Sequence, residues 1–397
     1  MAIIDNITIK GFKSIQDQTI SLGQMNVLIG TNGAGKSNFL EALAMLSSSA
    51  EGGIDYQKLS RKGARLSSHE IFRSAFKNKT RRDTFKLNVG MNEYEYKMRI
   101  NATNDFSYSS ETFTKSNNKI AGRSNRGATL HNKSINKLAQ NKSILGILQS
   151  FDNSYNPIID SLKDFAIYSP STPILRGVAE DKTFHEPLGL YGGGLAKALV
   201  NIIDSTNKNG KELKRFFKLL DWFQSIGVTS NINPNVVPEQ NLLGNIVVRY
   251  RDEFMKKNFN ELYAYDVSEG ALYILFVLIL LIHEDSPDIF ALDNIDSTLN
   301  PGLIKQLMIH ITEILSEHPE KQIFLTTHNP TTLDAIDLFN NNHRLFVVSR
   351  SETGQTELKR IEPPENTTKE EWEQKYFGLK LSEIWLSGAI GGMPKGF

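Results

Sequence analysis

The stretch Gly30-Thr-Asn-Gly-Ala-Gly35-Lys36-Ser37 decides the fold of this chain, because it fits the pattern G-x-x-x-x-G-K-[ST]. The residues before it, Met25-Asn-Val-Leu-Ile29, predict a short buried strand, and a helix is expected from Ser37 to about Met45. A glycine-rich turn between a strand and a helix lets backbone N–H groups turn toward an anion, and the helix directs its positive end at the same point. The sequence therefore predicts a phosphate-binding loop.

The pattern assigns a role to each part of this loop. Lys36 would bridge the β- and γ-phosphates of a nucleotide, and the Ser37 hydroxyl would ligate Mg²⁺. The backbone expected to surround the phosphates is that of Gly30, Thr31, Asn32, Gly33, Ala34 and Gly35. The alternative is a glycine-rich turn without a ligand, and the strand and helix on either side disfavour it. We expect the chain to bind ATP or GTP.

The composition sets the broad class of protein. A length of 397 residues allows two domains, or one domain with a large insertion. The net charge of +1 means that any nucleic-acid contact must come from local patches. The absence of cysteine excludes disulfides and thiolate metal sites, and it suits a reducing cytoplasm. The apolar run 271–282 is too short to span a bilayer, so we expect a buried helix there and no membrane segment. The opening Met-Ala-Ile-Ile-Asp-Asn lacks the basic and apolar regions of a signal peptide, so none is expected.

The pattern along the chain predicts an α/β fold in two separated halves. Strands are expected at 2–9 and 17–22, and an antiparallel meander at 84–90, 93–100 and 106–113. Helical patterns occur at 143–150, 194–206 and 210–225. Later segments alternate as strand 246–250, helix 269–283, strand 288–292, helix 302–316, strand 322–326, helix 331–337 and strand 344–349. This alternation favours a mostly parallel sheet covered by helices.

We therefore expect residues 1–114, with the antiparallel meander, and residues 241–397 to form the two halves of one nucleotide-binding head. Residues 115–240 are expected to be an inserted, mainly helical lobe. Its first part, 115–142, is rich in Ser, Asn and Gly and holds seven Lys or Arg residues without an acid. That composition predicts a mobile basic loop.

Three further segments complete a constellation with the loop. Asp288-Ile-Phe-Ala-Leu-Asp293 predicts a buried strand whose final Asp293 can reach the Mg²⁺ held by Ser37. Ser268-Glu-Gly270 opens the buried helix, and Gln322-Ile-Phe-Leu-Thr-Thr-His328 predicts a strand that ends in His328. Each segment alone is commonplace: an apolar strand often ends in Asp, and Ser268 could be an ordinary helix N-cap. Their order along one chain, after the phosphate-binding loop, favours a shared nucleotide site over these separate interpretations.

This order resembles the ATP-binding-cassette ATPases, and more narrowly their SMC, RecF and OLD-like branch. The opening Ile7-Thr-Ile-Lys-Gly-Phe-Lys-Ser14 and the loop with its continuation through Asn38 to Ala42 are similar to that branch's usual beginning. The resemblance covers about residues 1–50 and 240–335. It implies an ABC-type head that packs head to tail with a second copy around ATP and Mg²⁺, so that Ser268 and Gly270 of one copy cap the nucleotide of the other. It also implies that His328 contacts the γ-phosphate and that Asn38 belongs to the nucleotide site.

The chain departs from this branch after Asp293. The branch usually has a Glu that activates the attacking water, and this chain has Asn294, which can orient a water but cannot accept its proton. Asp296 could substitute, hydrolysis could be slow, or the site could bind ATP as a switch. We expect slow ATP hydrolysis. The Gln that usually senses Mg²⁺ is not identifiable in the sequence.

The partners are inferred from charge and from the resemblance. The basic stretches 61–82 and 115–142 could contact DNA or RNA, or could be solvated loops. Relatives with short heads often serve in bacterial anti-phage systems beside a separate nuclease. We expect a homodimer, or an assembly of dimers, that controls such an effector. The alternatives are a DNA-repair ATPase that acts directly on DNA and a nucleotide-sensing scaffold with negligible hydrolysis; coupling to a transporter is disfavoured.

Overall fold

The computed structural model describes residues 3–77, 79–135, 138–183, 185–204, 212–213, 217, 219–231 and 246–391. The chain divides into two compact units. Unit 1 comprises Met1–Ile167, Asp288–Ile295 and Glu317–Phe397, and unit 2 comprises Tyr168–Pro287 and Asp296–Ser316. The unit boundary thus falls at residue 168, later than the expected boundary at residue 115.

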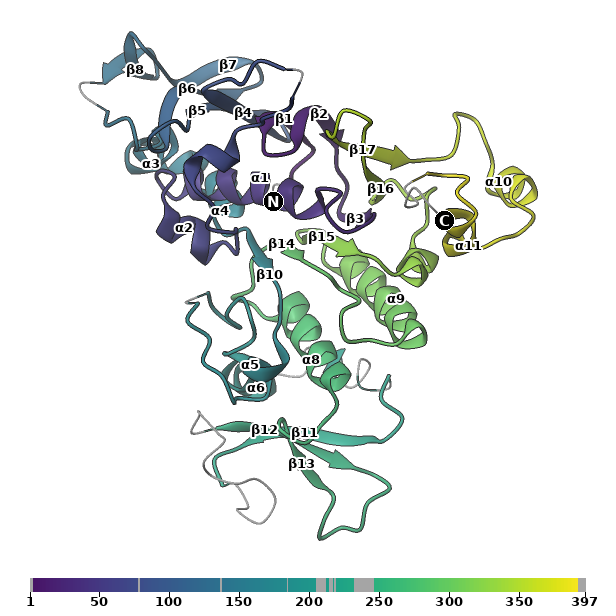
Figure 1. The fold of residues 1–397 in the computed structure, drawn as a ribbon. Helices are drawn as coiled ribbons and strands as arrows, with labels where there is room; N and C mark the ends of the chain where they lie inside the picture. Colours follow the sequence, from purple (N-terminus) through teal and green to yellow (C-terminus); the bar gives the residue numbers. More distant parts are fainter. Residues whose placement is uncertain are drawn as a thin grey trace. The chain divides into compact units, whose positions relative to one another are not determined.

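A six-stranded sheet in unit 1 carries the phosphate loop (Figure 1). Its order is β10 (Ala166–Tyr168), β14 (Ile289–Leu292), β15 (Gln322–Thr327), β3 (Met25–Ile29), β16 (His343–Arg350) and β17 (Thr356–Ile361). The four strands from β14 to β16 are parallel, and β17 pairs antiparallel with β16. Every residue of β3 is buried. Because the carboxyl ends of parallel strands meet at one edge, the residues after β3, β14, β15 and β16 come together there.

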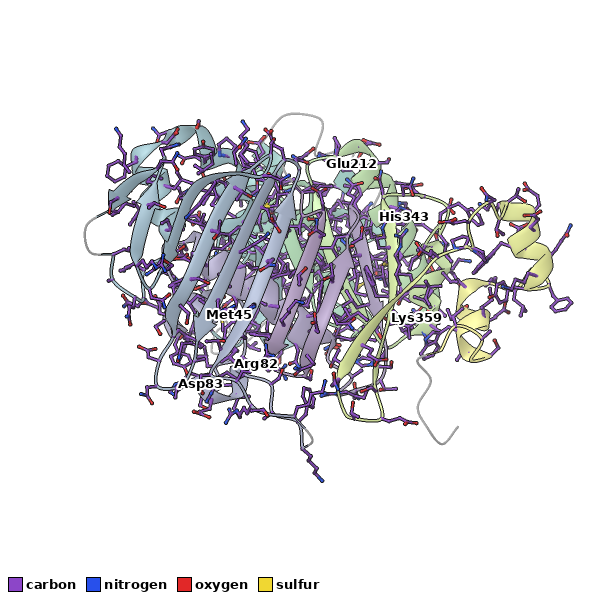
Figure 2. The ribbon with its side chains drawn as sticks, turned by 90° about the horizontal axis from the view of Figure 1, so that it is seen from above. Met45, Arg82, Asp83, Glu212, His343 and Lys359 are labelled. Carbon is purple, nitrogen blue, oxygen red and sulfur yellow. The ribbon has the colours of Figure 1, made fainter. Side chains whose placement is uncertain are left out.

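An eight-stranded sheet forms the second layer of unit 1, and Figure 2 shows its strands side by side. Its order is β2 (Ile15–Ser21), β1 (Asn6–Phe12), β4 (Thr84–Met91), β5 (Tyr94–Asn101), β6 (Ser107–Lys115), β7 (Asn118–Ser124), β8 (Gly127–Leu130) and β9 (Lys133–Ile135). All of these neighbouring pairs are antiparallel. The predicted meander is therefore confirmed.

The expectation of a mobile loop at 115–142 was wrong for residues 118–135, which form β7, β8 and β9. Asn117, Asn125 and Asn132 belong to tight turns between strands. Ser116 and Asn117 have φ angles of 46° and 66°, and His131 and Asn132 have φ angles of 44° and 62°. Two successive residues in the left-handed region are what a two-residue hairpin turn requires. The polar composition thus marked turns between strands, and not a loop.

Helix α1 (Lys36–Ala50) lies between the two sheets of unit 1 and is buried along almost its whole length (Figure 1). One cluster of buried apolar residues includes members of both sheets and of α1, and the Phe39 ring lies 6.0 Å from that of Phe324 on β15. The remaining helices of unit 1 are α2 (Tyr56–Arg61), η1 (His69–Phe72), α3 (Ile144–Phe151), η2 (Asn153–Tyr155), α4 (Asn156–Lys163), η4 (Pro330–Ala335), α10 (Lys369–Lys375) and α11 (Leu381–Leu386). The core thus holds α1, and with it the loop, in a fixed place.

Unit 2 contains helices and a small sheet. Among the described residues its helices are α5 (Thr172–Leu175), α6 (Leu195–Asp204), α8 (Glu269–Ile282) and α9 (Pro301–Glu317, which ends at the boundary), and its sheet has the order β11 (Phe223–Thr229), β12 (Val247–Asp252), β13 (Glu261–Tyr263). The run 271–282 of α8 is buried on all sides, as predicted. The helix expected at 210–225 lies partly outside the described residues, and its last residues belong to β11. Within the described part of the chain, no helix is long and apolar enough to cross a membrane.

Candidate functional site

The phosphate loop lies between β3 and α1, and its glycines are needed for two different reasons. Gly33 and Gly35 have φ angles of 74° and 115°, where a side chain would be strained. At Gly30 a Cβ would lie 2.1 Å from the carbonyl oxygen of Val348, and at Gly35 it would lie 2.1 Å from Thr356 Oγ1. The loop therefore owes its shape to its own backbone and to strands β16 and β17 behind it.

Lys36 directs its ammonium group back along the loop. Its Nζ donates to the carbonyl oxygens of Gly30, at 2.7 Å, and Thr31, at 3.2 Å. It also lies 3.3 Å from Nδ1 of His328, the residue that follows β15. The structure thus brings together two residues that the sequence predicted for phosphate contact, although 292 positions separate them.

Ser37 and Asp293 meet at the start of α1. Ser37 Oγ donates to Asp293 Oδ2 at 3.2 Å. The other carboxylate oxygen accepts a hydrogen bond of 2.5 Å from Thr326 Oγ1, which in turn accepts the Asn294 N–H at 2.8 Å. A hydroxyl and a carboxylate are the hard oxygen donors that Mg²⁺ prefers. The donor set therefore fits the magnesium site predicted at Ser37 and Asp293.

A cavity of about 250 Å³ opens beside these groups. Its lining consists of Asn32, Gly33, Ala34, Gly35, Lys36, Ser37, Asn38, Arg65, Asn294, His328 and Arg350. Glycine-rich backbone, one lysine and two arginines line the cavity, so this lining suits a polyanion. The residues fit a nucleoside triphosphate with Mg²⁺.

A family model described as "AAA domain, putative AbiEii toxin, Type IV TA system" matches residues 25–334, which is most of the chain and includes the loop, Ser268, Asp293 and His328. The chain belongs to this family. No curated protein matches it.

Solved structures of SMC heads share the fold of this AAA-domain chain. An Smc head bound to the C-winged helix domain of ScpA has a TM-score of 0.53 and 15% identity, over 91% of this chain and 98% of that chain. The Smc head domain from Pyrococcus furiosus, with an extended coiled coil and bound to the C-terminal domain of ScpA, has a TM-score of 0.52 and 13% identity, over 95% and 99% of the two chains. The fold is that of a phosphate-loop ABC-type head, as the resemblance predicted.

Arg65 is a cavity residue of this AAA domain that the sequence did not single out. Its Nε donates to Glu41 Oε1 at 2.6 Å, and its Nη2 donates to Asn38 Oδ1 at 2.8 Å. The hydrogen bond to Glu41 and, less strongly, the charge of Asp293 raise the pKa of Arg65. Buried Glu41 also accepts the Lys13 ammonium, whose pKa is lowered by burial. The only signal for Arg65 was its membership of the basic stretch 61–82.

Asn294 lies at the cavity with an exposed side chain and a φ angle of 60°. Asn tolerates this left-handed conformation better than Glu does, because its short amide can bond locally. The backbone at this position therefore offers a reason for Asn that is independent of catalysis. Asp296, the alternative base considered from the sequence, is half-buried and belongs to unit 2.

Ser268 and Gly270 also belong to unit 2 of this AAA domain. Ser268 is the N-cap of α8, and its Oγ accepts the Ala271 N–H at 3.3 Å. The Ser268 side chain is nevertheless exposed, and a Cβ at Gly270 would lie 3.3 Å from Leu299. The local structure thus accounts for Ser268 as the N-cap of α8, and the side chain remains accessible to solvent.

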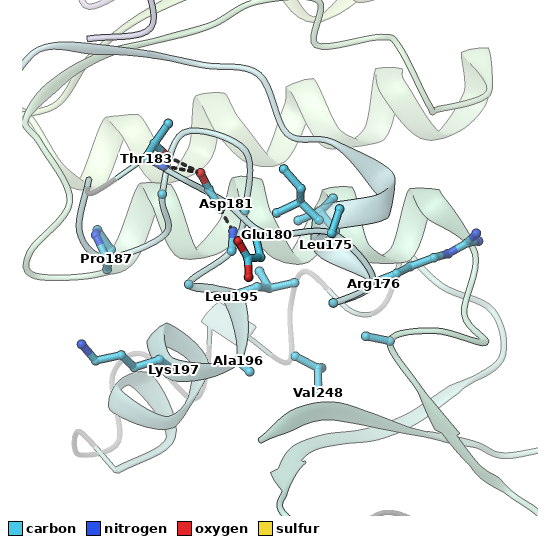
Figure 3. Close-up of a pocket in the computed structure, with 18 of the residues that line it drawn as sticks. Leu175, Arg176, Glu180, Asp181, Thr183, Pro187, Leu195, Ala196, Lys197 and Val248 are labelled. Carbon is cyan, nitrogen blue, oxygen red and sulfur yellow. Dashed lines mark hydrogen bonds between the residues drawn. The ribbon is translucent and has the colours of Figure 1, made fainter. Parts of the chain in front are cut away.

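A second cavity, of about 430 Å³, lies in unit 2 between the loop before α6 and strand β12 (Figure 3). The Asp181 carboxylate at its side accepts the Thr183 N–H at 2.9 Å, the Tyr191 N–H at 3.2 Å and the Gly193 N–H at 3.1 Å. Asp181 therefore holds the glycine-rich loop 192–194 in place. No predicted site residue lines this cavity.

Five of the eight basic residues in the stretch 61–82 form ion pairs within unit 1. They pair with nearby acids: Arg61 and Lys62 with Glu51, Arg65 with Glu41, Arg73 with Glu70 and Asp83, and Arg81 with Glu70. These ion pairs hold residues 61–82 against neighbouring segments of unit 1. Charge pairing of this kind is invisible when basic residues are counted along the sequence.

Proposed function

We propose that this chain binds ATP with Mg²⁺ in the cavity of unit 1 and hydrolyses it slowly. The observation that carries the proposal is the convergence of Lys36, Ser37, Asp293 and His328 at one edge of the parallel sheet. These residues come from three strand ends. The AAA-domain family and the ABC-head fold support the same activity.

The residues of the cavity have different roles in phosphoryl transfer. The loop N–H groups and the Lys36 ammonium hold the phosphates, and Ser37 with Asp293 would hold Mg²⁺, which supplies positive charge to the phosphate oxygens. Asn294 orients a water by hydrogen bonding without removing its proton. In this proposal His328, whose Nδ1 lies 3.3 Å from the Lys36 Nζ, donates to the terminal phosphate. With positioning and charge in place but no base at position 294, turnover is slow.

We further propose that ATP closes two copies head to tail and that the closed dimer controls a partner protein, with a nuclease in anti-phage defence as the leading candidate. Support comes from the exposed Ser268 at the N-terminus of α8, a point that attracts phosphate. Further support comes from the Smc heads, which bind ScpA, and from the family description, which names a putative toxin.

Two substitutions test this proposal. Lys36→Ala should abolish binding of a fluorescent ATP analogue and phosphate release. Ser268→Glu should still bind ATP but stay monomeric in light scattering with ATP and Mg²⁺, because a carboxylate repels the γ-phosphate. Thr368→Glu, at the exposed N-cap of α10, is the matched control and should dimerise. ATP-dependent dimers with phosphate release at background would favour the non-hydrolysing scaffold.

A second candidate function, direct contact with nucleic acid, is favoured by one observation on the eight-stranded sheet. Lys10, Lys86 and Arg99 lie directly opposite one another on β1, β4 and β5. Burial and, less strongly, the charges of Arg99 and Lys10 lower the pKa of Lys86, although Lys10 also pairs with Asp17 at 3.0 Å. Like charges in register destabilise a sheet, and a phosphate backbone would relieve them. Substituting all three by Gln should flatten the salt dependence of duplex DNA binding, and unchanged binding would remove this candidate.

A further inference from the structure

The hairpin formed by β16 and β17 lies directly behind the phosphate loop. It follows residue 334, where the match to the family model ends, and no motif in the sequence includes it. Strand β16 pairs with β3 along five residue positions, from Met25 to Ile29. Its Val348 carbonyl fills the space where Gly30 would carry a Cβ. The hairpin is therefore part of the wall that shapes the loop.

Arg350, at the end of β16, bonds to the tip of the loop. Its Nε donates to the Gly33 carbonyl oxygen at 2.9 Å, and its Nη1 donates to the Gly354 carbonyl oxygen at 2.6 Å. The side chain also lines the cavity of unit 1. Arg350 thus ties the hairpin turn to the phosphate loop and places a positive charge beside the nucleotide site.

Thr356, at the start of β17, bonds to the next peptide of the loop. Its Oγ1 donates to the Ala34 carbonyl oxygen at 2.7 Å and lies 2.7 Å from Ser14 Oγ, which accepts from Asn38 Nδ2 at 2.5 Å. Because the Thr356 hydroxyl donates its proton to Ala34, it accepts the proton of the Ser14 hydroxyl. Both hydroxyl groups in this row of hydrogen bonds therefore donate and accept, and the buried Thr356 hydroxyl has all its partners.

The bond to Ala34 has a consequence on the other side of the loop. In a trans peptide the C=O and the following N–H point in opposite directions. With the Ala34 carbonyl turned toward Thr356, the Gly35 N–H points away from the hairpin, on the side where Gly35 lines the cavity. The bond from Arg350 fixes the preceding peptide, between Gly33 and Ala34, whose Ala34 N–H closes the turn onto the Thr31 carbonyl oxygen at 3.2 Å.

We propose that Arg350 and Thr356 are positioning residues that orient the phosphate loop from outside and thereby set its affinity for ATP. The inference rests on the proposed function, because it assigns these residues to the same site. A loop N–H at the β-phosphate contacts ground state and transition state alike. Loss of its orientation therefore weakens ATP binding and leaves the rate of the chemical step largely unchanged.

The test compares four variants of the full chain with the parent. Thr356→Val keeps the volume and removes the hydroxyl, and Thr356→Ser restores it. Arg350→Met removes the guanidinium, and Arg360→Met on β17, where Arg360 pairs with Glu362 at 2.9 Å, is the matched control. For each we would measure the Kd for ATP with Mg²⁺, the rate of phosphate release at saturating ATP, and the Tm without nucleotide.

We expect Thr356→Val and Arg350→Met to raise the Kd about tenfold, the effect of one net hydrogen bond, with the saturated rate within about twofold of the parent. Thr356→Ser and Arg360→Met should bind as the parent does. Parental Kd values in folded Thr356→Val and Arg350→Met would overturn the inference. Should Thr356→Val fail to fold, a parental Kd in Arg350→Met, whose side chain is exposed, would still overturn the inference, and Arg350→Lys, which keeps the positive charge but loses the guanidinium, should raise the Kd as Arg350→Met does. A parent that does not bind ATP would instead refute the proposed function.

Discussion

Replacing Thr326 by Val should raise the concentration of Mg²⁺ that the ATPase requires. Thr326 is fully buried at the end of β15, and its Oγ1 is the link between two residues after β14. It donates to Asp293 Oδ1 at 2.5 Å and accepts the Asn294 N–H at 2.8 Å. Val has nearly the same shape without the hydroxyl, so the substitution removes both bonds and creates little space.

The magnitude follows from these two bonds. A hydrogen bond to a charged carboxylate contributes about 1.5–3 kcal/mol, and an N–H left buried without its partner costs about 1–3 kcal/mol. The residue that orients a metal-binding carboxylate typically changes metal affinity about 10- to 100-fold. We therefore expect Thr326→Val to lower the free energy of unfolding by about 2–4 kcal/mol and to raise the half-saturating Mg²⁺ concentration at least tenfold.

The assay is phosphate release at saturating ATP, titrated with Mg²⁺, together with unfolding by denaturant. Thr327→Val is the matched control, because Thr327 is also fully buried and its Oγ1 bonds to Thr332 at 3.0 Å and to the Asn329 N–H at 3.0 Å, without contact to Asp293. It should lose stability but keep the parental Mg²⁺ requirement. Thr326→Ser should resemble the parent in both.

One result would refute this reasoning. If folded Thr326→Val has the same Mg²⁺ requirement as Thr327→Val, then Thr326 does not orient a magnesium ligand. Asp293 would then have to be held by Ser37 alone, or the metal would have to lie elsewhere in the cavity.

Three further outcomes follow from other parts of unit 1. Fully buried Glu111 accepts hydrogen bonds from Tyr96 at 2.7 Å and from Ser143 at 2.8 Å and pairs with Arg123. Glu111→Ala should lower the free energy of unfolding by about 3–5 kcal/mol, measured with denaturant, because it leaves the Arg123 charge buried and unpaired. A loss below about 1 kcal/mol would show that water replaces the carboxylate. Burial lowers the pKa of His343, whose Nδ1 accepts the Asp337 N–H at 3.2 Å, so the unfolded protein binds a proton at this ring more readily than the folded protein does. The free energy of unfolding should therefore fall as pH drops from about 7 to 5, and His343→Asn should make this fall shallower. An equally steep fall in His343→Asn would show that the ring is already protonated in the folded protein. Asn294→Glu should speed steady-state phosphate release despite strain at a φ angle of 60°, with Asn294→Asp as the better-tolerated control; rates equal to the parent's in both would place position 294 away from the attacking water.

The sequence predicts most reliably where a function resides in contiguous residues. The phosphate loop, Asp293 and His328 each end a recognisable strand, so their meeting at one sheet edge follows from the parallel order. The buried helix 271–282 was likewise evident from its unbroken apolar run. In these segments local pattern and tertiary environment agree.

The rest depends on contacts between distant residues, which no local pattern records. Thr356 and Arg350 act on the loop from more than 300 positions away, through single hydrogen bonds. The strands β7 to β9 were hidden because they are short and polar and are separated by two-residue turns that each contain an Asn. The basic stretch 61–82 suggested a binding surface because its partners, Glu41 and Glu51, lie outside it in sequence.

The position of β3 in the middle of its sheet has a consequence for biosynthesis. Met25 pairs with Ile323 on one side and with His343 on the other, so both neighbours of this strand leave the ribosome only after most of the polypeptide has been made. Until then a strand that is apolar except for Asn26 has two open edges, which are sites for aggregation. A nascent or truncated product lacking β15 and β16 would be unable to grip a nucleotide, and a chaperone that shields the early segments would raise the yield of active protein.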